Sequence, residues 1–361
     1  MIVEGKHYRA VWREGNEVKV INQLVLPYEF RVVSLKGLAD AADAISTMLV
    51  RGAGTIGATA AYGMMLAVLN SKAKNKGELI EGIKNYAQVL KATRPTAVDL
   101  ANAVDRIAAY AENKKDLPEI KKGIVKEADL IADEIADGGK KIGISGEKLL
   151  GKNSRILTHC NAGWLALVDY GSALAPVYEA KRKGKKPFVL VDETRPRLQG
   201  AKLTAWELSN EGIAHAIIAD NAAGHFMQKG EIDICIVGAD RIAMNGDFAN
   251  KIGTYEKAVL AKENGIQFYV AAPFSTFDRK CTNGKEIAIE ERNEKEVNYV
   301  TGINAKGVME IVRVSNEKSH AKNPAFDVTP AKYVSGIITP AGIIKAGSIG
   351  IAKILGKGKA I

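Results

Sequence analysis

The second half of the chain repeats one pattern, in which a short apolar run is followed by a segment long enough for a helix. Each apolar run has the length of a single strand. Strands that alternate with helices predict a parallel, doubly wound α/β sheet, whose ligands bind beyond the carboxyl ends of the strands. The expected strands are Arg155 to His159, Pro187 to Val191, Ile213 to Ile218, Ile232 to Val237 and Ile266 to Ala271.

The first part of the chain has a different periodicity. Apolar and polar residues alternate from Tyr8 to Phe30, which predicts a small antiparallel hairpin or meander. Helical spacing then runs from residue 37 to 111, and a long amphipathic helix starts at Asp116 and is expected to end near Gly138. The expected domains are residues 1–140, a β-meander and helical domain with a connector helix, and residues 141–361, the α/β domain.

Composition excludes several classes of protein. The net charge of the 361 residues is +10, but the basic residues are dispersed and lack interleaved aromatics, so we expect no nucleic-acid partner. The positive field instead favours an anionic substrate such as a sugar phosphate. No apolar stretch approaches a membrane span of about 20 residues and the first residues lack a signal-peptide pattern, so we expect a cytoplasmic protein without membrane contact.

A thiol and a carboxylate follow two of the expected strands. Cys160 comes between an apolar run and the turn Asn161-Ala162-Gly163, and Asp240 follows the run that ends in Gly238. Both can converge on one crevice at the edge of the sheet. His159 is adjacent to Cys160, but neighbours on an extended chain point to opposite faces, so we expect a core or supporting residue rather than a Cys-His pair. The three cysteines match no zinc spacing, and we expect neither a disulfide nor a metal site.

Two arginine turns in the first part of the chain could bind an anion. Arg51, Gly52 and Ala53 open an alanine-rich helix, where backbone N–H groups and a guanidinium suit a phosphate. Close helix packing on the glycines is an equally good explanation. Arg94 lies at a second turn, and by itself it would be a surface residue as readily as a ligand.

Two polar segments in the second part complete the candidate site. Residues 192–200 follow a strand, and within them Gln199 is the member most free to reach a hydroxyl, while Asp192, Glu193 and Arg197 are expected to form a salt-bridged turn. The segment after Asp240 includes Asn250 and Lys251, and Lys251 opens the next helix, where a phosphate contact is favourable.

Taken together, eight motifs resemble those of the methylthioribose-1-phosphate isomerases, the aldose–ketose isomerases of methionine salvage. They follow one another in order along nearly the whole chain. They are Arg-Gly-Ala at 51–53, Arg-Pro-Thr-Ala-Val at 94–98, Thr-His-Cys-Asn-Ala-Gly at 158–163, Asp-Glu-Thr-Arg-Pro-Arg-Leu-Gln-Gly-Ala at 192–201, Gly-Ala-Asp-Arg-Ile at 238–242, Asn-Lys-Ile-Gly-Thr-Tyr at 250–255, Ser-Thr-Phe-Asp at 275–278 and Asn-Pro-Ala-Phe-Asp-Val-Thr-Pro at 323–330.

The resemblance implies a helical N-terminal domain, a Rossmann-like C-terminal domain, a homodimer and no organic cofactor. It implies that Cys160 and Asp240 are catalytic. The substrate-binding residues that it implies are Arg51, Gly52, Ala53, Arg94, Gln199, Asn250 and Lys251.

The chain departs from the family pattern at Gly54-Thr55, at Asp99 and at Trp164, and an apparent insertion near Val312 to His320 has no assigned role. Trp164 suggests either an apolar contact for a methylthio group or a core residue. The alternatives are isomerisation of ribose 1,5-bisphosphate or 5-deoxyribose 1-phosphate, and a non-catalytic subunit like the regulatory subunits of the exchange factor for initiation factor two, which have the same fold.

Overall fold

The computed structural model describes residues 1–95 and 97–356. It divides into two compact units, Met1–Ile144 with Ala162–Ala175, and Ser145–Asn161 with Pro176–Ile361. Thr96 of the Arg-Pro-Thr motif lies outside the described residues, as does the Lys-Gly-rich tail from residue 357 on, for which the sequence predicts disorder. Among the described residues, no helix combines the length and apolar composition needed to cross a membrane.

The first unit begins with antiparallel strands, which confirms the predicted meander. In it β4 pairs with both β3 and β5, and Val18 and Val20 on β4 are buried while the residues between them reach the surface. This alternation is what a sheet with one covered face requires. The strands are β1 (Ile2–Val3), β2 (Lys6–His7), β3 (Val11–Glu14), β4 (Glu17–Ile21) and β5 (Val32–Leu35).

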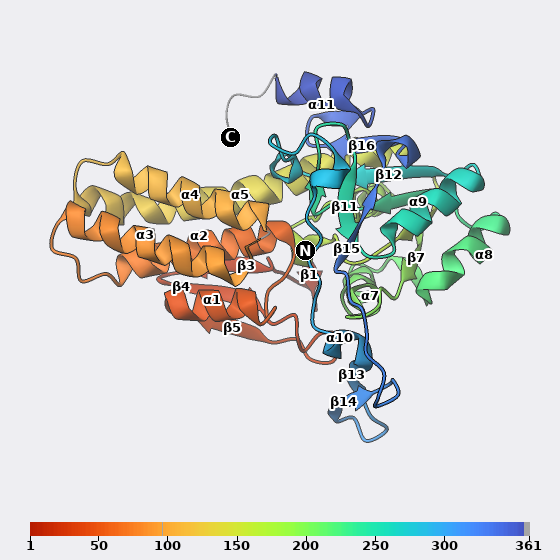
Figure 1. The fold of residues 1–361 in the computed structure, drawn as a ribbon, viewed down its shortest axis with the longest axis horizontal. Helices are drawn as coiled ribbons and strands as arrows, with labels where there is room; N and C mark the ends of the chain where they lie inside the picture. The colour runs from red at the N-terminus through yellow and green to blue at the C-terminus, as the bar shows by residue number, and fades with distance from the viewer. Residues whose placement is uncertain (96, 357–361) are drawn as a thin grey trace. The chain divides into compact units, whose positions relative to one another are not determined.

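The helices of the first unit pack around α2, whose residues are buried on all sides of the helix along most of its length. In Figure 1 α2 lies among α1, α3, α4 and α5, and the β3–β5 sheet lies beside this bundle. The side chain of Asn75 caps α3 by accepting the N–H of Glu78 (3.0 Å). The helices are α1 (Leu38–Ser46), α2 (Ala53–Leu69), α3 (Lys76–Thr93), α4 (Val98–Glu112) and α5 (Leu117–Gly146).

The start of α5 is as predicted, but its predicted end near Gly138 is wrong, because the helix continues to Gly146. Asp116 caps the start by accepting the N–H of Glu119 (2.9 Å). A Cβ at Gly139 would lie 2.6 Å from the carbonyl oxygen of Gly171. Gly139 therefore lets the backbone near Gly171 approach the middle of α5 closely, and it does not end the helix.

The second unit is built on a mostly parallel sheet of seven strands in the order β17-β16-β12-β9-β6-β7-β8. Six strands are parallel, and β17 is antiparallel to its neighbour β16. The parallel strands follow the doubly wound order 3-2-1-4-5-6. The strands are β6 (Arg155–Thr158), β7 (Phe188–Asp192), β8 (Ala214–Ile218), β9 (Ile234–Val237), β12 (Gln267–Ala271), β16 (Gly336–Thr339) and β17 (Gly342–Ile344).

All five strands predicted for this part of the chain are confirmed, together with the α/β fold class. Most side chains of β6, β7, β9 and β12 are buried, and Ile234 to Val237 are all buried, as a central parallel strand requires. The edge strand β8 buries only Ile218. The helices of the unit are α6 (Ala175–Arg182), α7 (Ala205–Asn210), α8 (Ala223–Gln228), α9 (Thr254–Glu263), α10 (Lys295–Asn298) and α11 (Ser348–Leu355).

Two smaller antiparallel sheets accompany the main sheet. One has the order β10-β11-β15, with β10 Arg241–Ile242, β11 Phe248–Lys251 and β15 Phe326–Thr329. The other is a hairpin of β13 (Tyr299–Ile303) and β14 (Met309–Arg313), which stands away from the main sheet in Figure 1. The apparent insertion at residues 312–320 begins within β14.

Candidate active site

Cys160 and Asp240 follow neighbouring strands at the point where the strand order of the main sheet reverses. Leu157 on β6 pairs with Cys235 on β9, and the two strands run parallel, so their carboxyl ends lie at the same edge. To one side of this point the order runs β6, β7, β8, and to the other β9, β12, β16. Open α/β sheets bind their ligands at such a reversal. The sequence predicted the shared edge, and the structure adds the reversal.

The backbone of Cys160 is held in a left-handed conformation, with φ of 66°. Its N–H donates to Oγ1 of Thr194 (2.8 Å), and its carbonyl accepts from Oγ1 of Thr204 (2.7 Å). A left-handed conformation at a non-glycine residue costs about 1–3 kcal/mol and persists only where its surroundings enforce it. The two threonine hydroxyls therefore fix the direction in which the half-buried thiol points.

A buried polar network supports this arrangement from behind. Nδ2 of Asn161 donates to Oγ1 of Thr204 (3.1 Å) and to Oε1 of Glu207 (2.8 Å). The hydroxyl of Tyr178 donates to the other carboxylate oxygen of Glu207, and burial, followed by the charge of Glu207, raises the pKa of that hydroxyl. Asn161 and Thr194 lie within the sequence motifs but had no predicted role. Thr204, Glu207 and Tyr178 were not predicted, because only the fold brings them together.

Asp240 lies beside Asn250 in the small β10-β11-β15 sheet. The N–H of Asp240 donates to the carbonyl of Ala249 (2.9 Å), the residue that precedes Asn250 on β11. Asp240 is exposed, whereas Asn250 is buried and donates from Nδ2 to Oγ1 of Thr254 (2.9 Å).

Lys251 ends β11 next to Asn250. Its ammonium donates to the carbonyl of Ala325 (2.8 Å) and lies 4.4 Å from the ring centroid of Phe326. Asp327, next along β15, accepts the N–H groups of Gly253 (2.7 Å) and Tyr255 (3.0 Å), and burial raises the pKa of its carboxyl. The structure therefore brings Asp240, Asn250 and Lys251 together at one end of this small sheet.

Gln199 is buried at the start of a π-helical turn, Gly200–Thr204. Its side-chain oxygen has no hydrogen-bond partner among the described residues. Such a buried acceptor is costly unless something donates to it. Π-helical turns recur at functional sites. Gln199 thus has the properties expected of a residue that accepts a hydrogen bond from a ligand hydroxyl.

The charged residues around Gln199 pair with partners from outside the 192–200 segment. Arg197 forms an ion pair with Glu296 (2.9 Å). Asp192 contacts His159 (2.9 Å) and lies 3.7 Å from the ammonium of Lys257. The expectation that the charges of this segment pair with one another is wrong for Arg197 and Asp192, because the fold supplies oppositely charged side chains from other elements.

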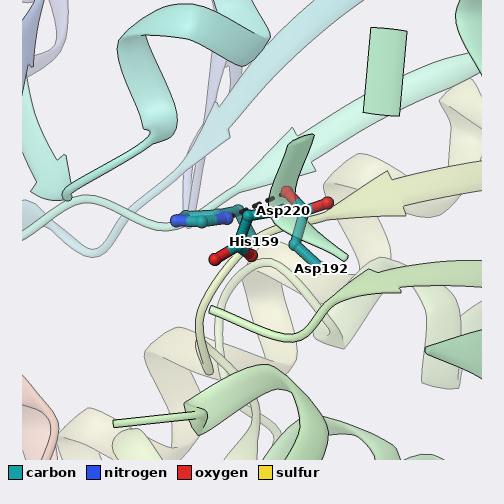
Figure 2. Close-up of side chains that lie close together, drawn as sticks. All are labelled: His159, Asp192 and Asp220. Atoms are coloured by element: carbon teal, nitrogen blue, oxygen red, sulfur yellow. Dashed lines mark hydrogen bonds and ion pairs between the residues drawn. The ribbon is translucent and has the colours of Figure 1, made fainter. Parts of the chain in front are cut away.

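His159, Asp192 and Asp220 bring ligand-type atoms within 4.8 Å of one another, as Figure 2 shows. Both carboxylate oxygens of Asp220 accept backbone N–H groups, from Thr194 (2.7 Å) and Arg195 (2.6 Å). Both ring nitrogens of His159 also have hydrogen-bonding partners. These hydrogen bonds indicate a structural cluster, in which Oδ1 of Asp192 is buried and has no hydrogen-bond partner among the described residues.

Four of the predicted binding residues belong to the first unit. Arg51 and Gly52 precede α2, Ala53 is its first residue, and Arg94 follows α3. Trp164 is also in this unit and is fully buried, which favours the core explanation for its side chain. Cys235 is a buried core residue of the second unit, and burial raises the pKa of its thiol.

The fold defines a doubly wound α/β protein, and Cys160 and Asp240 form a candidate ligand site at the strand-order reversal. A sequence profile of the initiation factor 2 subunit family matches residues 49–346, and the chain belongs to this family.

Within the family, the chain is similar to isomerases. It is 50% identical to methylthioribose-1-phosphate isomerase of Acetivibrio thermocellus, over 91% of this chain and 94% of the relative. Among solved structures, 5-methylthioribose 1-phosphate isomerase from Pyrococcus horikoshii is 44% identical, with a TM-score of 0.87 over 98% of this chain and 97% of that chain. These matches confirm the resemblance that the motifs indicate.

A structure with a different name is similar over the same length. The translation initiation factor eIF-2B subunit delta from A. fulgidus is 38% identical to this chain, with a TM-score of 0.84. The match covers 97% of this chain and 100% of that chain. The fold is therefore shared by proteins named as enzymes and proteins named as initiation-factor subunits, and the site residues must distinguish the two functions.

Proposed function

We propose that this protein is an aldose–ketose isomerase that converts 5-methylthioribose 1-phosphate into 5-methylthioribulose 1-phosphate. The observation that carries the proposal is the placement of Cys160 and Asp240 after the neighbouring strands β6 and β9, where the strand order reverses. Similarity to isomerases along nearly the whole chain supports the choice of reaction and substrate. We place the enzyme in methionine salvage, in the cytoplasm and as a homodimer.

The chemistry follows from the phosphate on the anomeric oxygen, which prevents the furanose from opening to a free aldehyde. The bond between C1 and the ring oxygen must break, leaving C1 poor in electrons. Cys160 donates its proton to the departing ring oxygen, and Asp240 takes the proton of the 2-hydroxyl as C2 becomes a carbonyl. The hydrogen on C2 moves to C1, either directly as hydride or through an enediol, and C1 keeps its phosphate.

The conformation of Cys160 suits this role. Its carbonyl and N–H are both hydrogen-bonded to threonine hydroxyls, which hold the backbone that carries the thiol. A positioned acid or base contributes about a hundredfold to ten-thousandfold in rate. Asp240 is exposed, so a substrate can reach its side chain.

We assign substrate binding to residues of both units. In the second unit, the buried side-chain oxygen of Gln199 accepts a hydrogen bond from a sugar hydroxyl, while Asn250 and Lys251 contact the sugar and its phosphate. In the first unit, the backbone at the start of α2 is suited to phosphate, because helix N-termini present free N–H groups. The proposed substrate-binding residues of the first unit are Arg51, Gly52, Ala53 and Arg94.

A second candidate is a non-catalytic subunit, which the 38% identity to an initiation-factor subunit favours. The two functions make different demands on the site. A binding module needs neither the strained Cys160 nor the buried acceptor on Gln199, whereas an isomerase needs both.

The test is turnover of 5-methylthioribose 1-phosphate, followed by 13C NMR of the C2 carbonyl of the ketose. The proposal predicts that Cys160→Ser and Asp240→Asn each lower turnover by at least about a hundredfold while the free energy of unfolding changes little. Turnover close to the wild type in either variant would exclude the assigned roles. A wild-type protein that is inert but binds an initiation-factor subunit would support the second candidate. Deuterium at C1 after reaction in D2O would indicate the enediol, and its absence the hydride.

A further inference from the structure

His159 is buried between the end of β6 and the turn that follows β11. The exposed fraction of this residue is 1%. Its Nε2 lies 2.8 Å from the carbonyl oxygen of Ile252, and its Nδ1 lies 2.9 Å from Oδ2 of Asp192. Figure 2 shows the ring directed at Asp192. Ile252 comes directly after Lys251, so one imidazole joins the Cys160 end of β6 to the Lys251 end of β11.

The two partners fix where the hydrogens of the ring must be. A carbonyl oxygen can only accept, so Nε2 of His159 carries a hydrogen and donates it to Ile252. On the other side, Nδ1 and Asp192 share a second hydrogen. The ammonium of Lys257 lies 3.7 Å from the same carboxylate oxygen, and burial raises the pKa of the Asp192 carboxyl while His159 and Lys257 oppose this shift. The ring therefore has one orientation in which both nitrogens are satisfied.

The turn after β11 packs directly against the imidazole ring of His159. Gly253 has φ of 99°, a conformation that favours glycine. A Cβ at this position would lie 3.1 Å from Cε1 and 3.2 Å from Nε2 of His159. The turn also donates from Gly253 N–H to Asp327. Its position is thus set by His159 on one side and by Asp327 on the other.

From this geometry we propose that His159 is a positioning residue for substrate binding, which holds the Asn250–Lys251 end of β11 in place relative to Cys160. The inference rests on the proposed function in that it takes Asn250 and Lys251 as substrate ligands. The functional part is the hydrogen bond from Nε2 to Ile252, because it connects the imidazole to the chain next to Lys251. The bond to Asp192 orients the ring.

Two substitutions separate the two hydrogen bonds. In His159→Gln the side-chain nitrogen reaches the position of Nε2, so the bond to Ile252 is kept and the bond to Asp192 is lost. In His159→Asn the nitrogen reaches the position of Nδ1, so the bond to Asp192 is kept and the bond to Ile252 is lost. The pair is matched, since each variant carries one amide and removes one of the two bonds.

The experiment measures kcat and KM for 5-methylthioribose 1-phosphate, together with hydrogen–deuterium exchange of the peptide that covers residues 250–255 in the protein without substrate. We expect His159→Asn to raise KM about twofold to tenfold, the range for loss of one hydrogen bond, to change kcat less, and to speed exchange of this peptide. We expect His159→Gln to keep both KM and exchange within about twofold of the wild type. The free energy of unfolding is measured for both variants.

Equal effects of the two variants on KM and on exchange would overturn the inference, as would an unchanged KM in His159→Asn. The exchange measurement needs no turnover. If the wild type does not act on the sugar phosphate, the proposed function fails, and exchange still shows whether Nε2 of His159 holds the turn after β11. If turnover is found but exchange is the same in both variants, only the role of His159 fails.

Discussion

Replacement of Thr194 by valine tests whether the strained backbone of Cys160 is held by a single hydroxyl. Valine has nearly the shape of threonine, and Thr194 is fully buried, so packing is conserved. The change removes the bond from the Cys160 N–H to Oγ1 (2.8 Å) and the bond from Oγ1 to the carbonyl of Asp192 (3.0 Å). Both partners are backbone groups, which keep their need for a hydrogen bond.

The magnitude follows from these two bonds. Each contributes about 1 kcal/mol net, and a backbone group left unsatisfied costs about 1–3 kcal/mol. We therefore expect the free energy of unfolding to fall by about 2–3 kcal/mol. Without the bond, the left-handed conformation of Cys160 loses about 1 kcal/mol of support, which lowers its population relative to relaxed conformations about fivefold. We expect kcat to fall by up to this factor.

The assay combines kcat from the NMR turnover experiment with denaturant unfolding of the same samples. Thr329→Val is the matched control, because Thr329 is also fully buried and its hydroxyl has no hydrogen-bond partner among the described residues. We expect this control to keep wild-type kcat and equal or higher stability. The reasoning would be refuted if Thr194→Val kept wild-type kcat while losing stability, since the hydroxyl would then support the fold and not the conformation of Cys160.

Three further predictions concern other parts of the second unit. Cys160→Ser should lower kcat by about a hundredfold to ten-thousandfold, and a smaller loss would exclude the thiol as the proton donor. Gln199→Leu should raise KM about tenfold without lowering the unfolding free energy, because it removes a buried oxygen that has no described partner; an unchanged KM would exclude a ligand contact. Burial opposes ionisation of Glu296, but hydrogen bonds from Arg292 and Arg197 outweigh it and lower the pKa of its carboxyl to about 2, from 4.5. The stability that ionised Glu296 contributes is therefore present above pH 4.5 and is lost as the pH falls toward 2. The difference in unfolding free energy between the wild type and Glu296→Gln should shrink over that pH range. A constant difference would contradict the lowered pKa of Glu296.

The main sheet of the second unit and the edge that carries the candidate site could be predicted, because continuous apolar runs indicate buried strands. Ile234 to Val237, for example, have the continuous apolar pattern that a central parallel strand requires. The end of α5 was not predictable, because the sequence does not show that Gly139 faces another stretch of backbone. A glycine that permits close packing and a glycine that ends a helix look the same in one sequence.

The site was only partly predictable for a related reason. Cys160 and Asp240 could be found because each follows an apolar run. The left-handed backbone of Cys160 and the hydroxyls of Thr194 and Thr204 depend on contacts between residues up to 44 positions apart. His159 was predicted to be a core or supporting residue, and its burial and hydrogen bonds confirm this, but its link to Ile252 needed the structure.

The most direct test of the proposed function is a competition in which the protein receives 5-methylthioribose 1-phosphate, ribose 1,5-bisphosphate and 5-deoxyribose 1-phosphate in one solution. Each ketose is followed by 13C NMR, so the relative rates give the ratio of the three kcat/KM values. We predict that the methylthio sugar is consumed first and that Cys160→Ser abolishes the preference along with the turnover. Faster consumption of either other sugar would contradict the assigned substrate, and no ketose from any of the three would contradict the assignment as an isomerase.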